Sequence, residues 1–289
     1  MKLKMIKYFA FALFSAAALT FTACEEEEPI DYEEPTLSFS GTDAVAINFA
    51  EETDHAKTIA FTVTVDAPAG IKAFTLHKVK LDGVTVVTDD ETDIIGALLD
   101  QTTGTYNLSD LVTFEQFVSG GFDKIEYEFI VTDNEDQVAN KKYTVTEVTA
   151  FPTSESGMFY NIVGADPGAY DLDNDVTVIQ AGEPANKHLI NTDVVGVAFT
   201  GSWMSTTPTG NGTEFVKVTG YDFTAGLVKS ARLLYAAGTP STVVDAPAVN
   251  DIYVAKLDTK YYVIKVTAIN PTEGTGVNKG QLTFDYLKY

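Results

Sequence analysis

Several stretches of the chain alternate polar and apolar residues with a period of two. Thr58–Val65 alternates threonine with apolar residues, and Lys124–Thr132 places Ile125, Tyr127, Phe129 and Val131 on one face. Such alternation is typical of strands that are buried on one side. Turn sequences separate these short stretches, so the pattern predicts an Ig-like antiparallel β-sandwich of about seven strands over residues 36–150. Leu111–Val118 fits either a strand or a helical turn.

The second half of the chain shows a similar pattern with one helix. The helix is expected near residues 224–237, because Leu227, Ala231, Leu234 and Tyr235 recur at helical spacing. Thr224 is the candidate N-cap and Gly238 the candidate stop. The strand candidates are Met158–Val163, Val176–Ile179, Val194–Phe199, Glu214–Val218, Asp251–Lys256, Tyr261–Ala268 and Gly280–Tyr286.

A segment rich in proline, serine and glycine, Phe151–Gly157, separates the two patterned regions and predicts the domain boundary. Residues 151–289 should therefore form a second β-sandwich or roll that carries the helix. The fold class predicted for the whole chain is all-β.

The first 35 residues differ from the rest. A stretch with three lysines, residues 1–7, precedes an uncharged apolar stretch, Tyr8–Phe21, and small residues lead to Cys24, the only cysteine. The apolar stretch is shorter than the roughly 20 residues that span a bilayer. The pattern predicts a bacterial lipoprotein signal peptide over residues 1–23, lipid on Cys24 and an acidic tether over residues 24–35. The alternative is an ordinary secreted protein with a free cysteine near the cut.

The formal net charge of the chain is −22, and residues 1–23 hold three lysines and no acids. The mature chain is therefore more acidic still. Nucleic acids need a basic footprint, so we expect no nucleic-acid partner. The same charge argues against adhesion to anionic lipid headgroups.

Two further segments carry a family resemblance. The run Cys24–Glu28 resembles the export signal of Bacteroidetes lipoproteins, which implies display on the outer face of the outer membrane. The sequence of residues 127–148 is similar to the Ig-like modules at the N-terminus of many Bacteroidetes surface lipoproteins, where the module is a spacer. The resemblance implies an outer-membrane, lipid-anchored protein facing the cell exterior.

The sequence offers no clear catalytic constellation. It has three histidines, no G-x-S-x-G elbow and no phosphate-binding glycine loop, and its one cysteine is the lipidation site. We therefore expect a protein that is not an enzyme. A hydrolase that uses a pair of carboxylates stays open as an alternative, since the chain has 41 acidic residues.

One acidic run has the alternating oxygen ligands of a calcium loop. It places Asp171, Asp173 and Asp175 at every second position, but Val176 follows where an EF-hand has glycine. An EF-hand is excluded, and a loop calcium or a plain turn with local side-chain bonds remains. No resident cofactor other than this calcium is expected.

The candidate ligand-binding element surrounds the single tryptophan. Trp203 lies in a stretch rich in threonine, glycine and proline, and an exposed ring there could stack on a sugar or another flat ligand. Tyr160, Tyr170 and Tyr221 are candidates for the same surface. The alternative is that Trp203 fills the core of the second domain.

The sequence of residues 250–289 is loosely similar to the C-terminal strands of the HmuY family of haem-binding lipoproteins. The resemblance implies haem capture, for which His188, Met158 and Met204 are the candidate ligands. The interpretation we favour is a non-enzymatic surface lipoprotein that binds a glycan or another nutrient, with an outer-membrane transporter as its expected partner. The alternatives are a structural or adhesive surface protein and haem capture.

Overall fold

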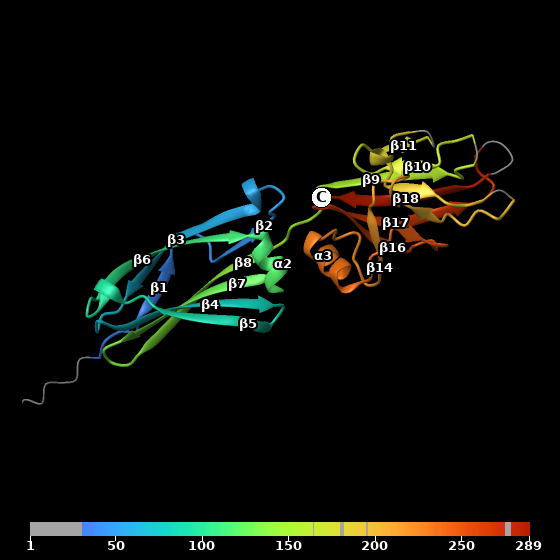
Figure 1. Ribbon diagram of the computed structural model, residues 1–289. Coiled ribbons are helices and arrows are strands. Elements are labelled where there is room, and N and C mark those ends of the chain that lie inside the picture. The colour runs from blue at the N-terminus through green and yellow to red at the C-terminus, as the bar shows by residue number, and fades with distance from the viewer. Residues whose placement is uncertain (1–30, 164, 180–181, 195, 275–278) are drawn as a thin grey trace, which may run out of the picture.

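The computed structural model describes residues 31–163, 165–179, 182–194, 196–274 and 279–289. These residues form two β-rich domains that follow one another along an elongated molecule (Figure 1). Four sheets contain the named strands of the described residues. The all-β fold class predicted from the sequence is confirmed.

The first domain is a sandwich of a three-stranded and a five-stranded sheet. Neighbouring strands are antiparallel, except that β2 and β8 are parallel. In sheet order, the smaller sheet contains β1 (Thr36–Phe39), β3 (Ala56–Asp66) and β6 (Thr103–Thr113). The larger contains β2 (Ala44–Ile47), β8 (Val138–Glu147), β7 (Lys124–Asp133), β4 (Ile71–Asp82) and β5 (Thr85–Asp93).

The period-two pattern of the sequence explains how these sheets pack. In β7 every second residue is buried, and the buried set includes Ile125, Tyr127, Phe129 and Val131, as the alternation predicted. Burying one apolar face of each sheet against the other is what stabilises a sandwich.

Short helical segments connect the strands of the first domain. The ambiguous segment Leu111–Val118 is divided, because β6 ends at Thr113 and the helix α2 (Phe114–Gly120) begins there. The Thr113 side chain accepts the backbone N–H of Gln116, and the Gln116 side chain accepts the backbone N–H of Thr113. This capping box fixes the start of α2. The 3₁₀ turns are η1 (Thr53–His55) and η2 (Gly96–Leu98).

The second domain has two five-stranded antiparallel sheets. In sheet order, the first contains β11 (Val176–Val178), β10 (Ala169–Asp171), β12 (Leu189–Asn191), β13 (Trp203–Met204) and β15 (Val243–Val244). The second contains β14 (Glu214–Val218), β16 (Ile252–Leu257), β17 (Lys260–Asn270), β18 (Gln281–Lys288) and β9 (Thr153–Tyr160). A 3₁₀ turn, η3 (Pro184–Asn186), precedes β12.

The second sheet is covered on both faces, which explains its nearly continuous apolar strands. Tyr253 and Ala255 of β16 belong to the core shared with the first sheet. Val254, between them, faces the opposite way and joins the core that contains the helix α3 (Val228–Ala237). The apolar stripe of α3 buries Val228, Ala231 and Tyr235.

Two boundaries differ from the sequence-based predictions. The helix starts at Val228 and not near 224, because the Asp222 carboxylate accepts the backbone N–H groups of Thr224 and Ala225 and forms a turn there. The helix end at Gly238 is as predicted. The expected linker after Pro152 is part of β9, which pairs with β18 along its length.

The expected strand Val194–Phe199 is not a strand in its described residues. The buried Asp193 carboxylate accepts the N–H and the hydroxyl of Thr200 and the N–H of Gly201. These bonds close the segment into a loop, which removes it from the sheet ladder.

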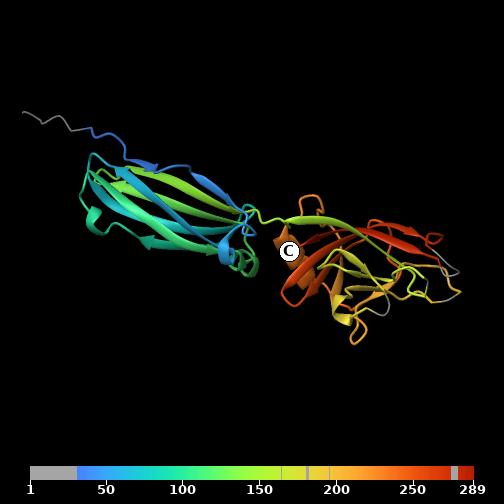
Figure 2. The ribbon, with the colours of Figure 1, turned by 90° about the horizontal axis from the view of Figure 1, so that it is seen from above.

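The chain passes between the domains through a bonded crossing. The Phe151 N–H donates to the Gly226 carbonyl at 2.9 Å, and the Val228 N–H donates to the Thr149 carbonyl at 3.0 Å. The described chain begins at the end of the first domain that lies farthest from the second domain (Figure 2). The predicted lipidation residue Cys24 and the signal peptide lie outside the described residues.

Candidate functional site

Trp203 is in the core of the second domain and not on its surface. Its side chain is 0% exposed, and its ring makes edge contacts with Phe159, Phe215 and Tyr253. The expectation of an exposed aromatic platform at Trp203 is therefore wrong. Trp203 faces inward because it lies on the short strand β13. The loop-like sequence around it did not predict this strand.

The tyrosines expected beside Trp203 do not form a common surface either. Tyr170 and Tyr221 are buried in two different cores. Tyr160 is partly exposed, and its hydroxyl contacts the Gln281 amide at 3.0 Å. The aromatic residues named from the sequence thus serve mainly to pack the protein.

An apolar groove lies at the end of the second domain. It has a volume of about 710 Å³, and its apolar wall contains Ile162, Val163, Ile190, Val194 and Met204. We call it the tip groove. Met204 reaches it because neighbouring residues of a strand face opposite ways, so Met204 lines the groove while Trp203 faces the core.

The tip groove is remote from the first domain. Strand β9 starts at Thr153, beside the domain crossing, and runs away from it to Tyr160, two residues before the groove. Eight strand residues span about 25 Å. The groove residues Ile162 and Val163 therefore follow the end of β9 that lies away from the domain crossing.

Two of the polar residues that line the tip groove, Asn191 and Asp193, are bonded to each other. The Asn191 amide donates to Asp193 at 2.7 Å, and the Asn191 carbonyl oxygen accepts the Ile162 N–H at 3.1 Å. Asp193 also accepts the bonds from Thr200 and Gly201. With these groups satisfied inside the wall, the face offered to a ligand is mainly apolar.

The acidic run after β10 forms a turn rather than an open calcium loop. Asp171 accepts the backbone N–H groups of Asp173 and Asn174, as in a local side-chain turn. Asp173 is bonded to the Lys260 ammonium at 2.8 Å and to the Tyr262 hydroxyl at 2.6 Å. Asp175 pairs with Lys288 and accepts the Tyr286 hydroxyl. The three carboxylates therefore do not converge on one point.

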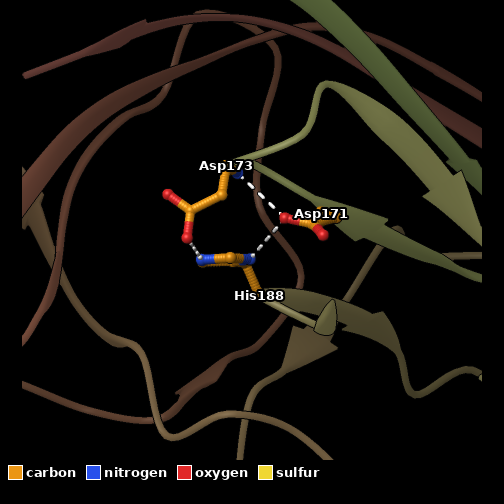
Figure 3. A group of neighbouring side chains, drawn as sticks. All are labelled: Asp171, Asp173 and His188. Carbon is orange, nitrogen blue, oxygen red and sulfur yellow. Dashed lines mark hydrogen bonds and ion pairs between the residues drawn. The ribbon is translucent and has the colours of Figure 1, made fainter. Parts of the chain in front are cut away.

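His188 joins two of these carboxylates. Figure 3 shows its ring between Asp171 and Asp173, with Nδ1 towards Asp171 and Nε2 towards Asp173. The Nδ1–Asp171 Oδ1 distance is 3.4 Å, and the Nε2–Asp173 Oδ2 distance is 3.8 Å. One ligand atom from each of the three side chains lies within 4.8 Å of the others, so this group could hold a metal ion.

Burial sets the charge of this cluster. Burial lowers the pKa of His188 below its usual value, although the nearby charges of Asp173 and Asp171 oppose the shift. Burial raises the pKa of Asp173, but the bonds from Lys260 and Tyr262 outweigh it, so the net pKa is lowered. At neutral pH the cluster thus holds a neutral imidazole beside ionised Asp173.

The residues considered for haem do not come together. His188 is fully buried in the cluster just described. Met158 is on β9, where its sulfur accepts the Gln281 amide, and Met204 is on β13 in the tip groove. Of the three, Met204 alone lines the groove.

A second hollow, of about 680 Å³, lies between the two domains. We call it the domain cleft and define it by Asp54, His55, Lys256, Asp258, Tyr261 and Tyr289. Its walls are joined by Tyr289, whose ring lies 5.5 Å from that of His55. The rings of Tyr261 and Tyr289 are both partly exposed.

Sequence reasoning missed both hollows. The tip groove uses apolar residues from segments about 40 positions apart, and the domain cleft joins residues from the two ends of the described chain. The one usable signal was the placement of Met204 next to Trp203, since strand alternation sends one of two neighbours outward.

The comparisons with known proteins are distant. No protein-family model and no curated protein matches the chain. A bacterial adhesin from Mobiluncus mulieris, which contains intramolecular disulfide, isopeptide and ester bond cross-links, is similar at 9% identity with a TM-score of 0.26, over 87% of this chain and 93% of the adhesin. A 1.5-MDa bacterial ice-binding adhesin is similar at 12% identity with a TM-score of 0.23, over 89% of this chain and 65% of the other. TM-scores this low support no argument about function.

No helix within the described ranges is long and apolar enough to cross a membrane.

Proposed function

We propose that this chain is a non-enzymatic binding protein, anchored at the outer membrane by lipid on Cys24 and facing the cell exterior. The basic start, short apolar stretch and single cysteine of the sequence support the anchor. A single acyl chain binds a membrane only weakly, so stable anchoring needs two or more acyl chains. A lipidated amino-terminal cysteine carries them on its thiol and its amino group.

The position of the tip groove is the observation that carries this proposal. The described chain begins at the end of the first domain that lies farthest from the second (Figure 2), and the groove residues Ile162 and Val163 follow the end of β9 that lies away from the first domain. The first domain then acts as a spacer that holds the groove away from the membrane. Ligand sites are concave and mostly apolar with a few placed polar groups, which is how this groove is built.

The lining of the tip groove favours a ligand with an apolar group. Apolar side chains from three segments, Ile162, Ile190 and Met204, face it, and no aromatic ring of the described chain lines it. A sugar ring would lack a stacking partner there. We therefore propose a nutrient or surface partner with an apolar moiety, which a neighbouring transporter could take up.

The domain cleft supports a second candidate function, the binding of a glycan. Tyr261 and Tyr289 offer partly exposed rings, which a sugar face can cover. Asp54 and Asp258 have no bonded partner among the described residues, and the Lys256 ammonium contacts only tyrosine rings there. Free carboxylates and an ammonium suit a ligand rich in hydroxyl groups.

An apolar dye tests the proposed groove site. Anilinonaphthalene sulfonate should gain fluorescence with the mature protein, and Met204→Glu should remove most of the gain because it places a charge in the groove. Val138→Glu is the matched control, since Val138 is 59% exposed on the first domain. Equal dye binding by the two variants, both folded, would argue against the groove.

A further inference from the structure

We propose that His188 and Asp173, with Asp171 beside them, form a binding site for a divalent transition-metal ion such as Zn²⁺. The site lies in the second domain, where the turn after β10 meets the start of β12 (Figure 3).

The hydrogen bonds of His188 define which nitrogen is available. The Leu172 N–H donates to Nδ1 at 3.3 Å, so the lone pair of Nδ1 is occupied and the proton of the neutral ring is on Nε2. Nε2 is buried and has no hydrogen-bond partner among the described residues. A buried polar atom without a partner is unfavourable and needs a physical explanation.

A metal ion bound at Nε2 supplies that explanation. When Zn²⁺ binds the lone pair of Nε2, the ring proton moves to Nδ1, where Asp171 Oδ1 lies 3.4 Å away and accepts it in place of the bond from the Leu172 N–H. Asp173, which faces Nε2, is then the second ligand. With zinc bonds of about 2.0–2.2 Å, tetrahedral ligand atoms lie roughly 3.4 Å apart. Nε2 and Asp173 Oδ2 are 3.8 Å apart, so a small approach brings these two ligand atoms to that spacing.

Asp171 positions the site and adds negative charge. Its Oδ1 atom accepts the Asp173 N–H at 2.9 Å and lies 3.4 Å from His188 Nδ1. It thereby fixes both the turn that carries Asp173 and the orientation of the imidazole ring, as the carboxylate bonded to the other nitrogen of a metal-bound histidine does in known metal sites.

Lys260 is the competitor of the metal ion. Its ammonium lies 2.8 Å from Asp173 Oδ2, the same oxygen that faces Nε2. The Lys260 side chain is 54% exposed, so it can turn into solvent when a cation takes its place. Removing this ammonium should tighten metal binding.

The donor set selects the ion. Imidazole suits zinc and other transition metals, whereas calcium takes oxygen ligands. Asp175 is engaged by Lys288 and Tyr286 and is not among the grouped ligand atoms. The site thus differs in both residues and ion from the calcium loop expected from the sequence.

Calorimetric titration with ZnCl₂ tests the proposal. The protein is the lipid-free mature chain carrying His55→Gln and His77→Gln, so that His188 is its only histidine. We expect the parent to bind one Zn²⁺ per chain. Asp173→Asn should bind Zn²⁺ with an affinity lower by about tenfold or more, and Lys260→Met should bind it more tightly. Asp175→Asn, the matched carboxylate control, should bind as the parent does, and CaCl₂ should give no stoichiometric binding.

Two results would overturn the proposal. One is the absence of stoichiometric zinc binding in both the parent and Lys260→Met. The other is equal affinity in Asp173→Asn and Asp175→Asn. Because Lys260→Met alters an exposed side chain and should raise affinity, it keeps the test valid even if Asp173→Asn prevents folding.

Discussion

The Arg232 guanidinium on α3 binds the Glu115 carboxylate on α2 across the two domains, at 3.0 and 3.4 Å. Arg232 also lies 5.6 Å from the centre of the Phe114 ring and 5.5 Å from that of Tyr261. One side chain of the second domain therefore contacts an acid and a ring of the first. This joint holds the two domains in the elongated arrangement.

Arg232→Ala should destabilise the protein more than Glu115→Gln. Glu115 is 65% exposed, and an exposed ion pair contributes at most about 1 kcal/mol. The two ring contacts add about 0.5–1 kcal/mol each. Urea unfolding of both variants measures the difference, and equal losses would show that the rings contribute nothing.

Trp203→Ala should cost about 3–5 kcal/mol of unfolding free energy, because it removes the largest fully buried side chain of the second domain. Trp203→Phe should cost clearly less, since it keeps a ring and removes an indole N–H that has no partner among the described residues. Val197→Ala, at a site 59% exposed, is the control. A Trp203→Ala protein as stable as this control would contradict the buried placement.

Asp251 should make stability depend on acid pH. Burial raises the pKa of Asp251, but bonds from the Lys217 ammonium, the Ala248 N–H and the Tyr253 hydroxyl outweigh it and lower the net pKa. The unfolded chain therefore takes up the proton first on acidification. The stabilisation is present above the unfolded pKa of about 3.9 and is lost as pH falls through the lower folded pKa.

Asp251→Asn should accordingly lose roughly 1–3 kcal/mol at pH 7 and show a shallower decline below pH 4. Urea unfolding between pH 7 and pH 2.5 measures both effects. Asp66→Asn, at an exposed position, is the control. If the unfolding free energy of Asp251→Asn falls below pH 4 as steeply as that of the parent, groups other than Asp251 set the acid dependence.

Cys24→Ser should release the protein from the membrane fraction of cells. It removes the thiol that accepts the lipid, and incorporation of labelled fatty acid should be lost with it. Replacing Glu25–Glu28 by alanine should retain the lipid but lower the fraction that external protease can reach. Continued membrane retention and labelling of Cys24→Ser would contradict the anchor.

The sequence was informative wherever one face of an element is buried. The alternation in β7 predicted the buried residues correctly. The stripe predicted for the helix identified the buried Ala231 and Tyr235, but it included the exposed Leu227 and missed the buried Val228. The sequence pattern failed for Trp203, because a two-residue strand has no period to detect. It also failed for the loop after Asp193, since bonds from Thr200 and Gly201 override the β-like sequence of that segment.

The sites were harder to predict because they depend on contacts between distant segments. Asp171 and Asp173 were candidates, but their link to His188 arises from the pairing of β10 with β12. The domain cleft requires His55 and Tyr289 to meet, and no local pattern encodes that.

The most direct test of the central claim is a thermal-shift panel on the mature protein and on Met204→Glu. The panel contains glycans, hemin and small apolar nutrients. A ligand at 100 times its dissociation constant adds about 2.7 kcal/mol of stability. We predict that a compound with an apolar group stabilises the parent protein and Val138→Glu but not Met204→Glu. A shift of equal size in Met204→Glu, or no shift with any compound of the panel, would contradict the proposal that the tip groove binds a ligand.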